Sequence, residues 1–174
     1  MARTELILGG QKSGKSRRAE LLARDWLAQS PTHRAVLIAT GQPWDEEMAA
    51  RIRRHQQDRA ERVPGMRTVE EPLALGEAIA LHADARTLLV VDCLTLWLTN
   101  LLMPAEGVID LDVAARSQAS PLAIAGLLSA IQLAQGPVVL VGNEIGLGVI
   151  PMGGETRAFV DALGCLNQDV APVC

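Results

Sequence analysis

The chain has 174 residues, of which 49% are apolar and 21% charged, a composition ordinary for one globular domain with a buried core. One Phe, three Trp and no Tyr offer few aromatic surfaces on which nucleic-acid bases could stack. The formal net charge of −4 also argues against a large footprint on a phosphate backbone, so we expect no nucleic-acid partner.

The first expected strand, at residues 6–8, leads into a complete phosphate-binding loop. Residues 9–16 read Gly-Gly-Gln-Lys-Ser-Gly-Lys-Ser, which satisfies the G-x-x-x-x-G-K-[ST] motif. The glycines let backbone N–H groups turn toward phosphate oxygens, Lys15 brings positive charge to the β- and γ-phosphates, and the Ser16 hydroxyl can ligate Mg²⁺. Apolar residues spaced three and four apart over 19–27 then predict a helix. This order of strand, loop and helix favours a nucleotide site over a chance glycine-rich turn.

Short apolar runs alternate with helical patterns along the rest of the chain. We expect strands at residues 35–39, 67–70, 88–91 and 138–141, and helices at 45–61, 73–83, 94–103, 120–134 and 155–169. This order predicts an α/β fold of the P-loop NTPase (RecA-like) type, a three-layer sandwich whose mainly parallel sheet is covered on both faces. Because no linker or repeat interrupts it, we expect residues 1–174 to form a single P-loop nucleotide-binding domain.

Residue types mark several of the expected helix ends. Asp45 is of the type that caps a helix N-terminus, and Pro104 stops the helix before it. The Ser120-Pro121 pair predicts a helix that begins there, because proline fits the first helical position, where its missing N–H group costs nothing. Residues 106–119 carry the weakest pattern, and 143–154 are expected to form a glycine-rich loop.

Ligands of parallel α/β sheets bind beyond the carboxyl ends of the strands. Besides the phosphate loop, the polar segments Thr40-Gly41, Asp92 and Asn143-Glu144 fall at such ends. Asp92 has the position of an acid that holds Mg²⁺ through its water shell, or of one that caps the next helix, and one side chain can do both. Glu144 is consistent with a general base, with a group that orients a substrate hydroxyl, or with a solvated loop acid.

His55 lies on the expected helix 45–61 and shares a face with Met48 and Ile52. The arginines near it in the sequence are Arg51, Arg53, Arg54, Arg59 and Arg62. Such a density of positive charge can hold a polyphosphate and stabilise a leaving pyrophosphate. Residue types alone nevertheless favour a structural histidine on a solvated basic face, because a lone histidine seldom acts as a nucleophile.

Several other features carry no catalytic prediction. His33 and His82 have no supporting cluster, and Glu70-Glu71 is as consistent with a turn as with a ligand contact. The three cysteines are odd in number and show no C-x-x-C spacing, which favours reduced thiols over a disulfide framework or a zinc site. We expect no signal peptide before the first strand and no membrane span in the weakly charged stretch 88–103, and therefore a cytoplasmic protein.

Together these segments resemble the bifunctional adenosylcobinamide kinase / adenosylcobinamide-phosphate guanylyltransferase family of cobalamin biosynthesis. The matching segments are, in order, residues 9–16, 38–41, 45–55, 92–102, 138–151, 157–161 and 166–168, and they cover nearly the whole chain. The phosphate loop is generic. The Met-Ala-Ala-Arg-Ile-x-x-His stretch ending at His55 and the Asn-Glu-x-Gly-x-Gly-x-x-Pro stretch starting at Asn143 are far more specific.

The resemblance reverses the interpretation of His55, because it implies that this histidine attacks the α-phosphate of GTP and becomes guanylylated. Lys15 is the second expected catalytic residue, and Ser16 and Asp92 are the expected Mg²⁺ ligands. The implied nucleotide contacts are Gly9, Gly10, Gln11, Lys12, Ser13, Gly14, Lys15, Ser16, Ala39, Thr40, Gly41, Gln56, Gln57, Asp58, Arg59, Glu70 and Asp92. GTP is the expected nucleotide, with ATP as an alternative phosphate donor. Adenosylcobinamide and its phosphate are the implied substrates, and a homotrimer that shares the corrinoid site is implied as well.

Three departures from the family pattern stand out. Met66 replaces a tryptophan that members usually carry, and the segment after His55 is a few residues longer. Members also continue into a last strand, which we expect to be missing here because the chain stops at Cys174. Two alternatives remain open: a small-metabolite kinase in which His55 is structural, and a switch-type nucleotide-binding module without catalysis.

Overall fold

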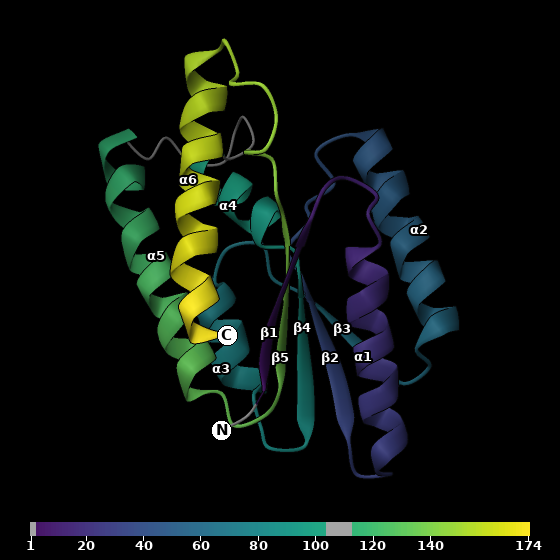
Figure 1. Ribbon diagram of the computed structural model, residues 1–174. Helices are drawn as coiled ribbons and strands as arrows, with labels where there is room; N and C mark the ends of the chain where they lie inside the picture. The colour runs from purple at the N-terminus through teal and green to yellow at the C-terminus, as the bar shows by residue number, and fades with distance from the viewer. Residues whose placement is uncertain (1–2, 104–112) are drawn as a thin grey trace.

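Five parallel strands form the middle layer of the protein, in the spatial order β1-β5-β4-β2-β3 (Figure 1). The computed structural model describes residues 3–103 and 113–174. The strands are β1 Thr4–Gly9, β2 Arg34–Ala39, β3 Arg67–Glu70, β4 Thr87–Asp92 and β5 Val138–Asn143. Each predicted strand is present, and the prediction of a parallel sheet is confirmed.

The helices cover both faces of this sheet. They are α1 Lys15–Gln29, α2 Glu46–Arg62, α3 Leu75–His82, α4 Leu94–Leu102, α5 Val113–Leu133 and α6 Gly154–Val170, followed by a 3₁₀ turn at Ala171–Val173. Helices α1 and α2 lie on one side of the sheet, and α3, α4, α5 and α6 lie on the other (Figure 1). The predicted three-layer architecture is therefore confirmed. No helix within the described residues has the length and apolar character that a membrane crossing requires.

Two hydrophobic clusters fill the spaces between the layers. Alternate residues of the central strands point to opposite faces, so that Ile38 and Leu89 pack toward α3 and α5 whereas Leu37 and Val90 pack toward α1. Because both faces are covered, the interiors of the central strands β2, β4 and β5 are apolar on both sides, as the continuous apolar runs in the sequence indicated.

The structure confirms one predicted helix start and contradicts another. The Asp45 cap is confirmed, since its Oδ1 accepts a hydrogen bond from the Met48 N–H at 2.6 Å. The predicted start at Ser120-Pro121 is wrong, because α5 begins at Val113 and contains Pro121 in its interior. A proline inside a helix removes one N–H donor from the helical ladder and its ring crowds the carbonyl four residues earlier. Packing of α5 against α3 and α4 outweighs this local cost. Pro104 and residues 106–112 lie outside the described residues.

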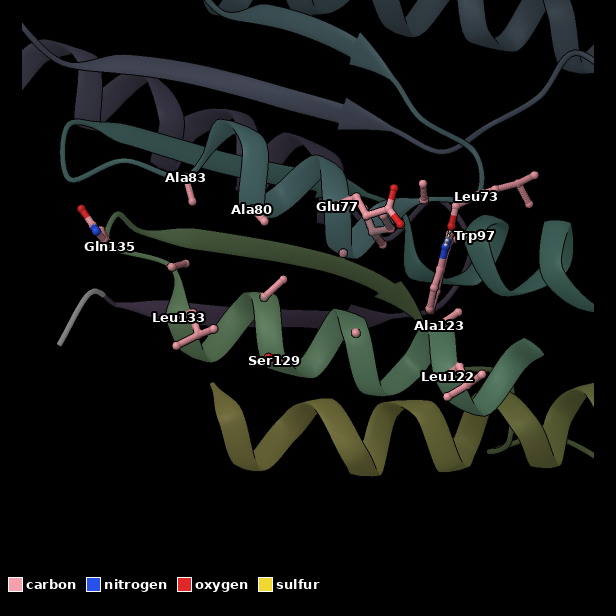
Figure 2. A pocket seen from close by; sticks show the side chains of 16 residues that line it. Leu73, Glu77, Ala80, Ala83, Trp97, Leu122, Ala123, Ser129, Leu133 and Gln135 are labelled. Atoms are coloured by element: carbon pink, nitrogen blue, oxygen red, sulfur yellow. Dashed lines mark hydrogen bonds between the residues drawn. The ribbon is translucent and has the colours of Figure 1, made fainter. Parts of the chain in front are cut away.

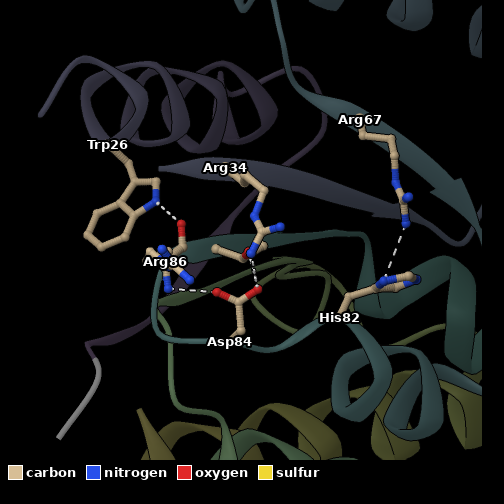
Figure 3. A network of polar contacts seen from close by, with 7 residues as sticks. Trp26, Arg34, Arg67, His82, Asp84 and Arg86 are labelled. Carbon is tan, nitrogen blue, oxygen red and sulfur yellow. Dashed lines mark hydrogen bonds and ion pairs between the residues drawn. The ribbon is translucent and has the colours of Figure 1, made fainter. Parts of the chain in front are cut away.

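A network of polar side chains lies at the end of the sheet where the parallel strands begin (Figure 3). Asp84 accepts hydrogen bonds from Arg34 Nη2, the Arg86 N–H and Thr87 Oγ1, each at 2.8 Å. The hydrogen bond from the Arg86 N–H is the largest cause that lowers the pKa of the Asp84 carboxyl. The contacts with Thr87 and Arg34 lower it further. His82 lies nearby, with Nδ1 at 3.3 Å from Arg67 Nη2.

His33 also has a local structural contact. Its ring stacks on Trp26 with the ring centroids 3.8 Å apart.

Candidate nucleotide site

The phosphate loop adopts a conformation that its glycines make possible. Gly14, the residue before α1, has φ of 91°, a left-handed conformation that side chains disfavour. A Cβ atom at Gly9 would lie 2.7 Å from Ser13 Oγ, so the loop closes tightly on itself. The Lys15 ammonium curls back over the loop, where it donates to the Gly10 carbonyl and to Ser13 Oγ. Ser16 follows in the first turn of α1, half-buried.

The other predicted strand-end segments meet the loop at the same edge of the sheet. Gly9 lies opposite Asn143 in the β1–β5 register, and the Glu144 N–H donates to the Gly9 carbonyl at 3.1 Å. Asp92 lies opposite both Ala39 and Val141, because β4 pairs with β2 and β5. The expectation that these segments gather around one edge is thus confirmed.

Thr40 ties the end of β2 to the end of β4 through a fully buried side chain. Its Oγ1 donates to the Cys93 carbonyl at 2.7 Å and accepts from the Cys93 N–H at 2.9 Å, directly after a cis peptide between Asp92 and Cys93. Burial raises the pKa of the Cys93 thiol to about 11, so it stays protonated. Thr40 therefore fixes the strand ends instead of facing a ligand with its hydroxyl.

Sequence reasoning missed two side chains of α4 that hold this edge together. Asn100 Nδ2 donates to the carbonyls of Thr40 and Pro72 at 2.8 and 2.9 Å, and Thr95 Oγ1 accepts from the Asn143 N–H at 2.8 Å. Both are buried polar residues in a mostly apolar helix. That contrast was the available signal, because a buried polar group needs a partner.

Helix α2 turns the predicted face toward the site. Ile52 and His55 are half-buried and Arg59 is buried, whereas Arg53 and Arg54 are exposed. The methyl of Ile52 lies 3.7 Å from the position that a Cβ atom would occupy at Gly41, so α2 packs on the loop after β2.

A direct contact joins α2 to the phosphate loop. With the Gln11 amide turned so that its oxygen faces Arg51, that oxygen accepts from both terminal nitrogens of Arg51 at 2.9 and 3.0 Å. His55 follows Arg51 by one helical turn, or about 6 Å along the axis. His55, predicted to be the nucleophile, therefore lies one helical turn beyond the residue of α2 that contacts the phosphate loop, and it is half-buried like Ile52.

Arg59 and Arg62, two of the arginines near His55, have different surroundings. Arg59 is only 6% exposed, and this burial lowers its pKa, while the negative charges of Asp92 and Glu20 oppose the shift. Arg62 instead pairs with Glu20 and Asp58, each at 3.0 Å. Arg59 is thus an inward positive charge near Asp92, and Arg62 belongs to an ion-pair network on the side of α2.

The remaining predicted nucleotide contacts are spread over α2 and β3. Gln56 Nε2 donates to Glu70 Oε1 at 3.3 Å, which brings two of these residues together at the edge strand. Gln57 is exposed, and Asp58 pairs with Arg62. Neither of the last two is connected to the phosphate loop by a hydrogen bond among the described residues.

Ser16 and Asp92 have the donor chemistry of a nucleotide-bound Mg²⁺. Such an ion takes few protein ligands, one hydroxyl and one carboxylate being typical, and keeps phosphate oxygens and waters in its other positions. Over residues 3–103 and 113–174 there is no cluster of three or more His, Cys, Asp or Glu that could form a dedicated metal cage. The residues present therefore fit a magnesium ion that arrives with a nucleotide.

A separate hollow of about 680 Å³ lies between α3 and α5 (Figure 2). Leu73 and Trp97 lie at one end and Gln135 at the other, and none of the predicted nucleotide contacts lines it. It is therefore distinct from the site at the carboxyl edge.

The phosphate loop on β1, the acid at the end of β4 and the parallel sheet between them define a P-loop nucleotide-binding protein. The family model described as "Cobinamide kinase / cobinamide phosphate guanyltransferase" matches residues 5–174. The chain therefore belongs to this family of bifunctional enzymes.

Three curated relatives support this family assignment. The bifunctional adenosylcobalamin biosynthesis protein CobP of Pseudomonas aeruginosa is 45% identical over 98% of this chain and 88% of its own length. The bifunctional adenosylcobalamin biosynthesis proteins CobU of Escherichia coli and Salmonella typhimurium are 39% and 37% identical, each over 95% of this chain and 88% of their own length.

Proposed function

We propose that this enzyme catalyses both reactions of its family at the one nucleotide site, with His55 as the residue that carries the guanylyl group. The contact between Arg51 and Gln11 is the observation that supports this most directly, because it holds α2 against the phosphate loop one turn before His55. His55 is also half-buried, unlike the exposed Arg53 and Arg54 of the same helix.

In the kinase reaction, the hydroxyl of adenosylcobinamide forms a bond to the γ-phosphorus of the nucleoside triphosphate. The bond from that phosphorus to the β-phosphate oxygen breaks, and the nucleoside diphosphate leaves. Lys15 and the N–H groups of the loop stabilise the charge of the transferring group. Mg²⁺, held by Ser16 and Asp92, would supply further neutralisation of the phosphate charge. Glu144 is the candidate to accept the hydroxyl proton, since its backbone is bonded to Gly9 beside the loop.

In the guanylyl reaction, an imidazole nitrogen of His55 attacks the α-phosphorus of GTP. A P–N bond forms, the bond to the β-phosphate oxygen breaks, and pyrophosphate leaves. A phosphate oxygen of adenosylcobinamide phosphate then attacks the same phosphorus, which breaks the P–N bond, restores His55 and yields adenosylcobinamide-GDP. The covalent intermediate divides one difficult exchange into two displacements. Arg59, buried on the same face of α2, is the candidate to stabilise the departing pyrophosphate.

Incubation with α-labelled GTP tests this mechanism. We expect label on the protein that is acid-labile and base-stable, as a phosphoramidate is. The label should be absent from His55→Ala and retained in His82→Ala, whose histidine lies at the amino end of the sheet. Label that persists in His55→Ala would exclude this histidine as the nucleophile.

The same experiment separates the two alternatives. Phosphorylation of adenosylcobinamide without any protein label would favour a small-metabolite kinase. Nucleotide binding without turnover in either reaction would favour a switch-type module. Lys15→Ala should depress both reactions, because the two share one phosphate loop. A homotrimer remains part of the proposal and is testable by sedimentation.

A further inference from the structure

The loop after β5 exposes a run of large apolar side chains at the nucleotide edge of the sheet. The exposed fractions are 91% for Leu147, 95% for Val149, 77% for Ile150 and 96% for Met152. Residues 145–154 contain no charged side chain. Exposed apolar residues are common when scattered, but several within one short segment indicate a binding surface.

Hydrogen bonds brace this loop at both ends. At its start the Glu144 N–H bonds to Gly9 of the phosphate loop, and Glu144 Oε1 accepts from the Gly146 N–H at 2.6 Å. At its end Arg157 Nη1 donates to the carbonyls of Pro151 and Met152 at 2.9 and 2.6 Å. The apolar side chains therefore lie on a segment that begins beside the phosphate loop at Glu144 and is held by Arg157 at its other end.

We propose that residues 145–152 form the binding surface for the corrin ring of the acceptor substrate, an inference that rests on the proposed function. A corrinoid is far larger than the nucleotide, with broad apolar ring faces and a rim of amide groups. Its reacting hydroxyl must reach the γ-phosphate, so its body must lie beside the phosphate loop. The loop offers apolar side chains for the ring faces, and its glycine-rich backbone offers N–H and carbonyl groups for the amides.

A second copy of the chain is a poorer match for this surface. A stable subunit interface involves about 20–30 residues on each side, which is well above what this short loop supplies. The loop is also continuous with the nucleotide site through the bond from the Glu144 N–H to the Gly9 carbonyl.

The double variant Leu147→Ser/Val149→Ser tests the proposal. The matched control is Leu81→Ser/Leu133→Ser, which replaces two leucines with exposed fractions of 78% and 77% on α3 and α5. Binding of adenosylcobinamide is measured by equilibrium dialysis with detection of the corrinoid colour. We expect at least tenfold weaker binding in the loop variant and unchanged binding in the control, because two apolar side chains lose their contact area.

Two further measurements separate the possible causes. Labelling by α-labelled GTP and the sedimentation coefficient should both be unchanged in the loop variant. Corrinoid affinity within twofold of wild type would overturn the proposal, and a changed assembly state with normal affinity would assign the loop to a second copy instead. Loss of labelling would assign it to the nucleotide. If the wild-type protein binds adenosylcobinamide but takes no label, the His55 mechanism is refuted. The proposed corrinoid-binding surface at residues 145–152 is not affected by that result.

Discussion

The packing of α3 against α5 permits a matched test at two glycines. A Cβ atom added at Gly76 would lie 2.9 Å from the carbonyl carbon of Gly126 and 3.0 Å from the backbone nitrogen of Leu127. A Cβ atom added at Gly126 would meet nothing within 4 Å. The two residues lie on facing helices, so Gly76→Ala and Gly126→Ala add the same atom on the two sides of one contact.

The expected free energies of unfolding follow from these distances. Replacing a helical glycine by alanine gains up to about 1 kcal/mol, because alanine restricts the unfolded chain and favours the helix. Gly126→Ala should show this gain. Gly76→Ala gains no more than this and also forces two backbones apart, which costs about 1–3 kcal/mol. Gly76→Ala should therefore be less stable than Gly126→Ala by at least about 1–3 kcal/mol.

Thermal and urea denaturation measure this difference. For a chain of this size it corresponds to about 2–12 °C in Tm. GTP labelling per folded molecule should be the same in both variants, because both glycines line the hollow between α3 and α5 and neither belongs to the predicted nucleotide contacts. Equal Tm values for the two variants would refute the close approach of α3 and α5 on which the estimate is based.

Three further outcomes are expected. Asn100→Ala leaves the buried carbonyls of Thr40 and Pro72 without their shared donor, so urea denaturation should show a loss of about 2–3 kcal/mol; a loss below about 0.5 kcal/mol would contradict this role. Because the fold lowers the Asp84 pKa, its stabilising contribution should be complete above pH of about 4 and disappear as the pH falls below that, and Asp84→Asn should remove this part of the pH dependence of Tm. Asp92→Asn should reduce the kinase kcat about 10²–10³-fold and weaken its Mg²⁺ dependence, whereas an unchanged kcat would restrict Asp92 to a structural role.

Much of the site was readable because its signals are local. The spacing within Gly9–Ser16, the apolar run before Asp92 and the cap at Asp45 each depend on neighbours in the chain, and the structure has the corresponding loop, strand end and helix start. The Ser120-Pro121 signal failed because it is equally local, and packing of α5 with distant helices overrides it.

The sequence alone determined that the fold is α/β, which strand ends carry polar groups and which family the motifs resemble. Only the tertiary structure decided that β5 lies between β1 and β4, which brings Glu144 to Gly9, and that Arg51 of α2 lies within reach of Gln11 in the phosphate loop. Strand pairing and helix docking join residues far apart in the chain, and their free energy depends on shape and burial over the whole molecule. A pattern of neighbouring residue types cannot encode that choice by itself.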